Sequence, residues 1–375
     1  MSLETTEALV ASSNVYTWEP PNRVIAARYG LNPEDILRFD TNTSPAVLSY
    51  LPQVLEGPWD PPLHEYPDST YAELAEAAAD YVGARPDEIL VGCGADEVLD
   101  IIAKTYLSPG RKSVVPVPTY SMYAVLTGQR DAELVSVPRK AADEGYALDV
   151  EAMVAALPGA GAVWLCVPNN PTGTPESRAD LLAILDAGAA LPDGGPAIVV
   201  DEAYIEFDGV SLVALRERYP ALIVVRTLSK AFAMTGLRVG YCVATRTTIE
   251  QLERVRPPGS LNTLSAKAAA RALRQPGLAA ANAAALGEER EWLAARLADA
   301  GLPASPSVTN FLLCHVGRPS EADQLNEALL RGGIVVRTFG PDSPLAGHLR
   351  FTVRDREQNE RFLQVIEAWS AGRSA

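Results

Sequence analysis

The sequence predicts an α/β protein: a large domain with a mostly parallel sheet covered by helices, and a smaller α+β domain. Short β-branched runs alternate with helical stretches between residues 89 and 255, as expected of parallel strands joined by helices. The string R-P-P-G at 256–259 breaks this alternation, and long alanine-rich helical stretches follow. We therefore expect a large domain over residues 40–255 and a small domain formed by residues 1–39 and 256–375.

The first hundred residues contain few regular elements. A short helix is expected over residues 22–29, where a glycine follows the last turn. Residues 52–67 are rich in proline and do not fit a regular helix. The helix after them should run to about Val82. A short strand at residues 89–91 then turns into a helix that ends near Leu107.

The other elements follow from the same periodicities. Strands of the large domain are expected at 113–117, 133–137, 162–167, 197–201, 222–227 and 239–244. Helices are expected near 119–128, 149–157, 177–190 and 210–218. The small domain should contain strands near 310–314, 333–337 and 348–353, a helix near 320–331 and a final helix, with the N-terminal segment packed on them. Functional loops should collect at the carboxyl ends of the parallel strands.

Composition argues against several classes of function. Of the 375 residues 47% are hydrophobic, which is ample for a sizeable core, and the formal net charge is −15. An acidic chain of this kind is a poor match for nucleic acid or an acidic membrane surface. The four cysteines form no C-x-x-C pair and the three histidines show no ligand spacing, so we expect neither a metal site nor disulfides. Without a basic leader or a membrane-length apolar run, a cytoplasmic location is expected.

The apolar run at 222–227 ends in hydroxyl residues and Lys230. A lysine at a strand end can form a Schiff base with a bound carbonyl compound. Thr227, Ser229 and Arg238 supply hydroxyl donors and a guanidinium group, which suit a phosphate dianion. An amine for an aldehyde beside donors for a phosphate points to pyridoxal phosphate. On this stretch alone, a solvated loop lysine is an equal alternative.

A second motif places Asp201 at the end of an apolar strand, with Tyr204 three residues later. A carboxylate there can face the cofactor's pyridine nitrogen and keep it protonated, a contact worth about 4 kcal/mol at an effective dielectric near 20. The protonated ring is then an electron sink. Tyr204 can bond the cofactor's phenolic oxygen. A helix-capping aspartate and a core tyrosine are the alternative interpretation.

Three further turns follow predicted strands. In N-N-P-T-G at 169–173, Asn170 offers an amide to the phenolic oxygen, although the string also fits a simple tight turn. The small residues at 92–97 allow backbone N–H groups to reach a phosphate at a helix N-terminus, where Asp96 is also a possible cap. Tyr120 can stack on the cofactor ring or belong to the core.

Arg337 and Arg350 end or interrupt apolar strands thirteen residues apart. An arginine inside a strand destabilises the fold unless its charge is paired. The pair is explained if the two guanidinium groups bind the carboxylate or phosphate of a substrate. A structural salt bridge is the alternative.

In order and spacing together, these motifs resemble fold-type I pyridoxal-phosphate aminotransferases, and most closely the histidinol-phosphate aminotransferase family. The resemblance runs from Tyr16 to the final helix. Its most specific strings are N-N-P-T-G at 169–173, D-E-A-Y at 201–204 and T-L-S-K at 227–230 with Arg238, supported by P-T-Y-S-M-Y at 118–123 and Y-P-D at 66–68.

The resemblance implies a role for each matching residue. Lys230 would bind the cofactor aldehyde and move protons, Asp201 would meet the ring nitrogen, and Asn170 and Tyr204 would meet the phenolic oxygen. The cofactor phosphate would be held by Ala95, Asp96, Thr227, Ser229 and Arg238. Tyr66 would reach that phosphate from the partner subunit, which implies a homodimer with a shared active site. Positions that meet the substrate would be Tyr16, Asn42, Arg337 and Arg350.

The expected reaction is a ping-pong transamination between an amine donor, histidinol phosphate, and the acceptor 2-oxoglutarate, in histidine biosynthesis. An aromatic amino-acid aminotransferase, a threonine-phosphate decarboxylase-like lyase and a non-enzymatic pyridoxal-phosphate-binding protein are the alternatives. The chain departs from the family at 42–45 (N-T-S-P for N-E-N-P), in the proline-rich 56–67, and at Arg354, Cys93 and Ala95. Most of these positions lie at the expected substrate mouth, so they bear on substrate identity more than on cofactor or reaction type.

Overall fold

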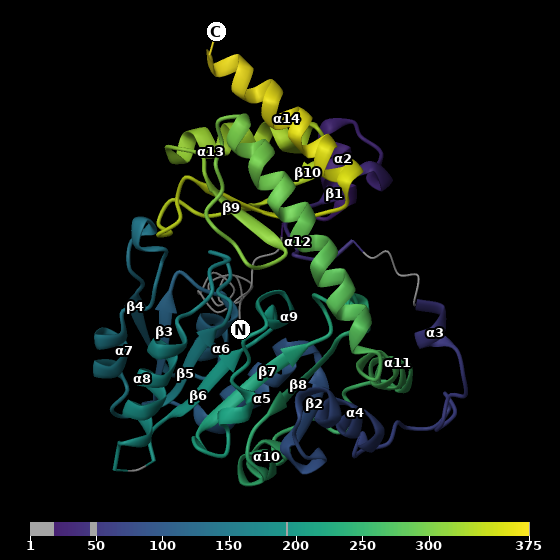
Figure 1. The fold of residues 1–375 in the computed structure, drawn as a ribbon, viewed down its shortest axis with the longest axis vertical. Coiled ribbons are helices and arrows are strands. Elements are labelled where there is room, and N and C mark those ends of the chain that lie inside the picture. Colours follow the sequence, from purple (N-terminus) through teal and green to yellow (C-terminus); the bar gives the residue numbers. More distant parts are fainter. Residues whose placement is uncertain (1–18, 46–50, 193, 375) are drawn as a thin grey trace, which may run out of the picture.

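A seven-stranded sheet forms the centre of the molecule in the computed structural model, which describes residues 19–45, 51–192 and 194–374 (Figure 1). The strand order is β2-β8-β7-β6-β5-β3-β4. The strands are β2 (Ile89–Cys93), β3 (Lys112–Val117), β4 (Glu133–Pro138), β5 (Ala160–Cys166), β6 (Ala197–Asp201), β7 (Leu222–Thr227) and β8 (Val239–Val243).

The predicted, mostly parallel sheet is confirmed, with one strand reversed. Strands β4, β3, β5, β6 and β7 pair in parallel. Strand β8 is antiparallel to both of its neighbours, β2 and β7. The carboxyl ends of all strands except β8 therefore meet at one edge of the sheet.

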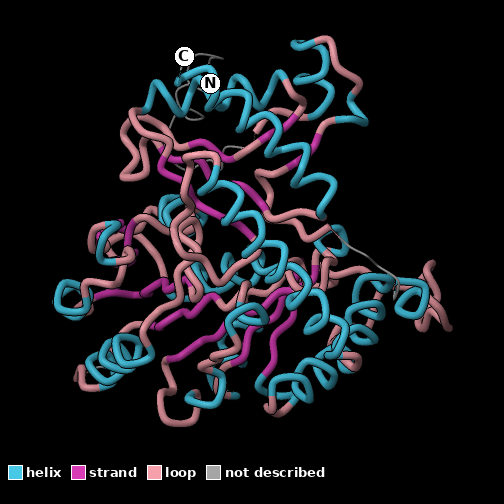
Figure 2. Tube along the Cα trace, turned by 45° about the horizontal axis from the view of Figure 1, so that its top comes forward, coloured by secondary structure: helices cyan, strands magenta, loops and turns pink. Residues whose placement is uncertain are grey.

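Helices cover both faces of the sheet (Figure 2). One face packs against α4 (Ala72–Val82), α7 (Val150–Ala156), α8 (Arg178–Ala189) and α11 (Thr263–Leu273). The other face packs against α5 (Gly94–Tyr106), α6 (Met122–Gln129) and α10 (Arg246–Glu253). In β5, Val163 and Leu165 face the first group, whereas Ala162 and Trp164 face the second. Burial on both faces explains why the strands are continuous apolar runs.

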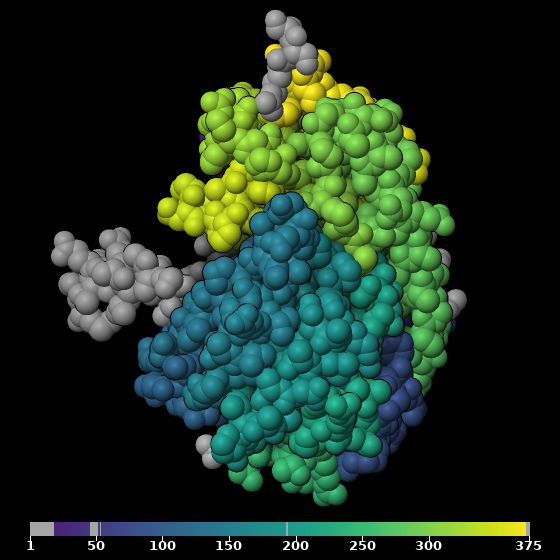
Figure 3. All heavy atoms as spheres, turned by 60° about the vertical axis from the view of Figure 1, so that its left-hand side comes forward, coloured from purple at the N-terminus to yellow at the C-terminus, as the bar shows by residue number. Residues whose placement is uncertain are grey.

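A smaller unit sits above the sheet and caps its carboxyl edge (Figures 1 and 3). Its three-stranded sheet has the order β11-β12-β9, and β1 pairs in parallel with β10. These strands are β1 (Leu37–Arg38), β9 (Phe311–His315), β10 (Ile334–Val335), β11 (Arg337–Thr338) and β12 (His348–Thr352). The helices of this unit are α2 (Asn22–Tyr29), α13 (Pro319–Arg331) and α14 (Arg356–Ser374). The N-terminal segment packs here because Ile25 and Ile36 share a core cluster with Val335.

Helix α12 (Pro276–Asp299) connects the two units. Ala279 and Ala283, near its start, belong to the core of the large sheet. Leu293 and Leu297, near its end, belong to the core of the small unit. Because α11 and the start of α12 pack on the large sheet, a domain boundary at residue 255 stays a prediction.

Two expectations for local structure are wrong. Residues 210–218 contain only a 3₁₀ turn, Val213–Leu215, because the Ser211 hydroxyl accepts the Val213 N–H and favours a turn over a helix. A short helix, α9 (Ile205–Asp208), precedes it. The proline-rich segment begins with another short helix, α3 (Leu51–Leu55). A proline is tolerated near the start of a helix, because the amide it lacks has no partner there.

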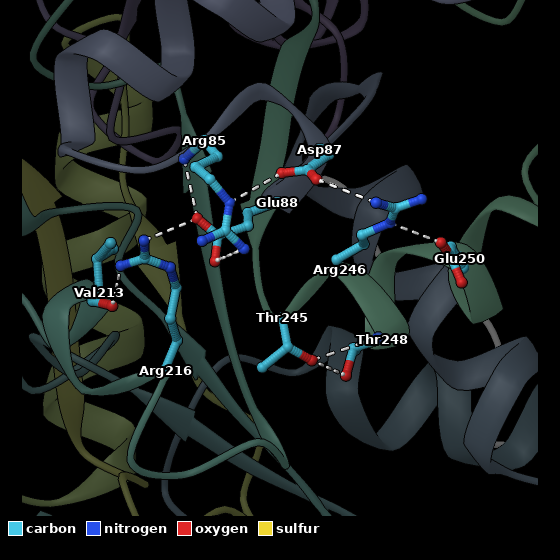
Figure 4. Close-up of polar contacts among 9 residues, drawn as sticks. All are labelled: Arg85, Asp87, Glu88, Val213, Arg216, Thr245, Arg246, Thr248 and Glu250. Atoms are coloured by element: carbon cyan, nitrogen blue, oxygen red, sulfur yellow. Dashed lines mark hydrogen bonds and ion pairs between the residues drawn. The ribbon is translucent and has the colours of Figure 1, made fainter.

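Ion pairs stabilise the end of the sheet opposite to the carboxyl ends of the parallel strands, next to the amino end of β2 (Figure 4). The buried Glu88 carboxylate accepts hydrogen bonds from Arg216 Nη2 at 2.7 Å and from the Arg85 backbone amide at 2.9 Å. Arg246, at the start of α10, lies between Asp87 and Glu250. Across the described residues, no helix is long and apolar enough to cross a membrane, and no group of three or more metal-ligating side chains is found.

Glycine at position 240 is required by the close approach of β8 to the start of α5. A Cβ atom there would overlap the backbone of Gly94 and Ala95. We expect Gly240→Ala to lower the free energy of unfolding by about 1–3 kcal/mol, measured by urea denaturation. The control is Gly287→Ala in α12, where a Cβ atom would meet nothing within 4 Å. That substitution should stabilise the protein by about 0.5–1 kcal/mol, and equal effects of the two would contradict this packing argument.

Candidate active site

A cavity of about 420 Å³ opens where the carboxyl ends of the parallel strands meet the small unit. It brings together residues from both units that are far apart in the sequence. The sequence-predicted site residues that line it are Asn42, Ala95, Asp96, Tyr120, Asn170, Asp201, Tyr204, Thr227, Ser229, Lys230, Arg238, Arg337 and Arg350.

Two predicted residues are not part of this cavity wall. Tyr66 lies on the proline-rich segment with 91% of its surface exposed, away from the cavity of its own chain. Tyr16 lies outside the described residues.

Lys230 follows the end of β7 and reaches into the cavity. Its Nζ donates to the Thr41 carbonyl at 3.4 Å and lies 5.6 Å from the centre of the Tyr204 ring. Burial, assisted by the nearby Arg350 guanidinium, lowers the pKa of Lys230 to about 8. A sizeable fraction of this amine is therefore neutral, and nucleophilic, near physiological pH.

Asp201 ends β6 and is almost completely buried. Its Oδ2 accepts a hydrogen bond from the Tyr123 hydroxyl at 2.8 Å, and its Oδ1 accepts one from the Ala203 amide at 3.1 Å. Burial raises the pKa of Asp201 to about 6, although both hydrogen bonds oppose this rise. The group is thus a poorly solvated carboxylate at neutral pH, suited to a cationic ring nitrogen.

Tyr123 was not among the predicted site residues, although it stacks on Trp164 directly beneath the site at 5.5 Å. The second tyrosine of the P-T-Y-S-M-Y string was the available signal. Its partner Asp201 lies 78 residues later, which local spacing does not reveal.

Asn170 and Tyr204 are each oriented by a residue of the small unit or the N-terminal segment. The Arg350 guanidinium donates to Asn170 Oδ1 at 2.6 Å. Asn42 Nδ2 donates to the Tyr204 hydroxyl at 3.0 Å. Arg350 also donates to the Asp40 carbonyl, so hydrogen bonds compensate for its burial in β12.

The N-terminus of α5 and the loop after β7 form one polar nest. Arg238 Nη2 lies 3.3 Å from Asp96 Oδ2, and the Tyr120 hydroxyl donates to Asp96 Oδ1 at 2.9 Å. A Cβ atom at Gly94 would lie 2.7 Å from Arg238 Nη2, so glycine is needed to keep the guanidinium against the helix end. On the other side, Thr227 Oγ1 donates to Ser229 Oγ at 2.9 Å. Hydroxyl groups, a guanidinium and a helix N-terminus together suit a phosphate dianion.

Several lining residues were not predicted from the sequence: Glu19, Asp40, Thr41, Thr43, Cys166, Ala203 and Thr235. Four of them lie between residues 19 and 43, a stretch whose own residue pattern gives no local signal that it returns to the cavity. Thr235 donates to the Ser229 carbonyl at 2.6 Å and thereby fixes the loop that carries the lysine.

A buried ionic network supports β6 and β7 behind the cavity. Arg226 Nε lies 2.7 Å from Glu202 Oε2, and Arg226 Nη1 lies 3.2 Å from Glu206 Oε1. Ser211 joins the network through hydrogen bonds with both Arg226 and Glu202. Glu202 directly follows Asp201, and Arg226 directly precedes Thr227, so the network holds both strand ends in position.

The residues present fit pyridoxal phosphate. The lysine has a lowered pKa, the aspartate lies in the same cavity, and the nest offers donors for a dianion. In addition, Asn42 Oδ1 is buried and has no hydrogen-bond partner among the described residues, so it is available to a ligand.

Comparisons with known proteins agree with this chemistry. The family model "Aminotransferase class I and II" matches residues 35–366. A histidinol-phosphate aminotransferase of Symbiobacterium thermophilum is 38% identical over 309 residues, covering 82% of each chain. Another, of Roseiflexus castenholzii, is 34% identical over 371 residues, covering 96% of each chain. The crystal structure of histidinol-phosphate aminotransferase from Sinorhizobium meliloti in complex with pyridoxal-5'-phosphate superposes with a TM-score of 0.84 at 24% identity, covering 95% of this chain and 96% of that one.

The chain belongs to the class I and II aminotransferase family. It is a pyridoxal-phosphate-dependent aminotransferase with the fold-type I architecture, and the two relatives named above, 38% and 34% identical, are histidinol-phosphate aminotransferases. The resemblance to that family noted in the sequence is confirmed.

Burial of Asp201 destabilises the cofactor-free protein in a pH-dependent way. The carboxyl group titrates near pH 6 when folded, against 3.8 in its unperturbed state. Between these values the folded chain binds more protons, so stability falls as pH rises through this window. Above pH 6 the free energy of unfolding is lower by the full amount, about 3 kcal/mol.

We therefore expect Asp201→Asn to stabilise the cofactor-free protein by up to about 3 kcal/mol at pH 8, while abolishing most activity. The gain should shrink to less than about 1 kcal/mol at pH 4, where the aspartate is protonated in the folded state and about half protonated in the unfolded state. Urea denaturation at the two pH values measures the effect. Asp143→Asn, at an exposed position, is the control and should change stability by less than about 0.5 kcal/mol. A gain of equal size at both pH values would contradict the assignment.

Proposed function

We propose that the protein catalyses transamination between histidinol phosphate and 2-oxoglutarate in histidine biosynthesis. The names of its relatives support this substrate pair. The observation that carries the proposal is the pairing of Arg337 with Arg350 across β11 and β12, above the reactive lysine. Directly opposed residues of antiparallel strands project to the same face. The pair therefore offers two cations to the phosphate of the donor or to the carboxylates of glutamate.

Each site residue has a defined task in this proposal. When bound, the cofactor supplies an aldehyde and a conjugated ring that draws electrons from the substrate carbon. Lys230 Nζ would take the proton from the carbon that bears the donor's amino group, and the lowered pKa suits this base. Asp201 would keep a proton on the ring nitrogen by its charge. Asn170 and Tyr204 would hold the phenolic oxygen.

The remaining predicted residues bind and orient. Arg238, Thr227, Ser229 and the start of α5 at Ala95 and Asp96 would hold the cofactor phosphate. Tyr120 would pack on the ring, where its hydroxyl is already fixed by Asp96. Asn42 would place its unpartnered Oδ1 toward the ligand. Tyr16 would contact the substrate, and we retain a cytoplasmic location as the setting of the reaction.

A homodimer with shared active sites completes the proposal. Tyr66 and Leu63 are 91% and 63% exposed on the proline-rich segment. This segment is not loosely attached, because Arg271 packs on Trp59 at 4.8 Å and donates to the carbonyls of Val54 and Pro58. Large apolar groups exposed on an anchored segment favour contact with a partner. A second copy would thereby supply Tyr66 to the phosphate nest.

Replacement of the lysine tests the chemistry. We expect Lys230→Ala to lower kcat by at least about 10²–10⁴-fold, because no other amine can take its place at the reacting carbon. Spectral half-reactions with histidinol phosphate, glutamate and phenylalanine, run side by side, also test the donor. Lys267→Ala, on α11, is the control and should keep activity. Wild-type turnover by Lys230→Ala would refute the mechanism.

Preference for phenylalanine would favour an aromatic aminotransferase, and carbon dioxide release without 2-oxoglutarate would favour a decarboxylating lyase.

Mixed dimers test the shared site. Tyr66→Ala should weaken cofactor binding by about 10- to 100-fold, because a hydrogen bond to a charged group is lost. At a cofactor concentration that leaves Tyr66→Ala dimers largely without cofactor, exchange of subunits with Lys230→Ala protein should restore activity, because each hybrid dimer contains one site with both native residues. Activity before and after exchange, together with sedimentation, measures this. A monomer in solution, or no recovery after proven exchange, would rule out the shared site.

A further inference from the structure

The cavity wall contains a carboxylate that the sequence did not lead us to expect. Glu19 precedes α2 and lines the cavity beside Arg337, with about 20% of its side chain exposed. Its Oε1 lies 3.6 Å from Arg337 Nη1, which is an ion pair beyond hydrogen-bond distance. One of the two substrate-facing arginines is therefore accompanied by an acid.

Glu19 is held in this position by its surroundings. The carbonyl of the adjacent Pro20 accepts a hydrogen bond from Arg38 Nη1 at 2.7 Å. Arg38 in turn pairs with the buried Asp40 at 2.6 Å. The backbone of Thr338 also stabilises the ionised carboxylate. The carboxylate is thus a fixed feature of the wall.

The environment of Glu19 leaves its charge poorly solvated. Burial raises the pKa of this carboxyl group, an effect that Arg337 opposes and the charge of Asp40 reinforces. A carboxylate has about four acceptor positions, and the backbone of Thr338 uses only part of this capacity. A ligand N–H group directed at Glu19 would supply a charge-assisted hydrogen bond where solvent is largely excluded.

The geometry also separates two kinds of ligand group. Arg337 and Arg350 are directly opposed on β11 and β12 and together attract an anion. Glu19 lies at the side of this pair and repels a second anion placed next to it. A donor with an anionic group and an N–H-bearing ring matches both features, whereas a phenyl ring offers the carboxylate no further hydrogen bond.

Resting on the proposed function, we propose that Glu19 is a specificity-determining residue that accepts a hydrogen bond from a ring N–H of the amine donor. The arginine pair binds the anionic group of the same donor. The favoured substrate class is accordingly that of amines with an imidazole-type side chain, in preference to apolar aromatic ones.

Histidine and phenylalanine form a matched pair of probes, because they share the amino and carboxylate groups and differ in the ring. We expect Glu19→Leu to lower the ratio of kcat/KM for histidine to that for phenylalanine by about 10-fold or more, chiefly through KM for histidine. Glu19→Gln keeps an acceptor oxygen and should give an intermediate ratio. Glu34→Leu, at an exposed position of the 3₁₀ turn Pro33–Asp35, removes a carboxylate outside the cavity wall and should leave the ratio unchanged.

Binding provides a readout that does not require turnover. The inhibition or dissociation constants of 3-(4-imidazolyl)propionate and 3-phenylpropionate should show the same change in ratio. If Glu19→Leu does not fold, judged by thermal unfolding, the isosteric Glu19→Gln variant gives the result. An unchanged or increased preference for the imidazole ligands in the variants would overturn the proposal.

Failure of the proposed function can be recognised separately. Histidinol phosphate is measured alongside the two amino acids with the wild-type enzyme. If it is not turned over but the variants lose imidazole preference, the substrate assignment fails and the role of Glu19 stands. If histidinol phosphate is turned over but the variants keep the wild-type preference for the imidazole ring, the substrate assignment stands and the role of Glu19 fails.

Discussion

Ionisable groups are withdrawn from water at the carboxyl edge of the seven-stranded sheet, and the rest of the structure has to accommodate this. Lys230 and Asp201 lie in one cavity, and burial shifts both pKa values toward the neutral form. Burying the two groups costs free energy of folding. A protein of this size can tolerate this cost, because the strands that lead to the two groups are buried along their whole length. The same loss of hydration makes the Lys230 amine a nucleophile and leaves the Asp201 carboxylate in need of a cationic partner.

The support behind the site is polar as well as apolar. Glu202 and Arg226 are neighbours of Asp201 and Thr227 in sequence, but their side chains form a buried ion pair on the far side of the strand ends. A buried pair of this type contributes little net stability but is costly to break. It therefore fixes β6 and β7 relative to each other, and with them the distance between acid and amine.

Much of this arrangement could be predicted from the sequence, because strand, turn and chemistry fall within a few residues. Lys230 follows one apolar run and Asp201 ends another, and the bounds of these strands in the structure, Leu222–Thr227 and Ala197–Asp201, match the prediction. The reversed β8 could have been inferred too, since the connection after β7 is too short for a crossover helix. The contacts of Tyr123 and Glu19 could not be inferred, because each residue meets its partner only through long-range packing that no local pattern encodes.

Helix α12 is a continuous rod of 24 residues, about 36 Å long, with one end rooted in the large sheet and the other in the small unit. Arg337 and Arg350 belong to the small unit, whereas Lys230 belongs to the large one. Because the two ends of α12 belong to different cores, any change in the separation of Lys230 from the two arginines would also have to reorient this helix.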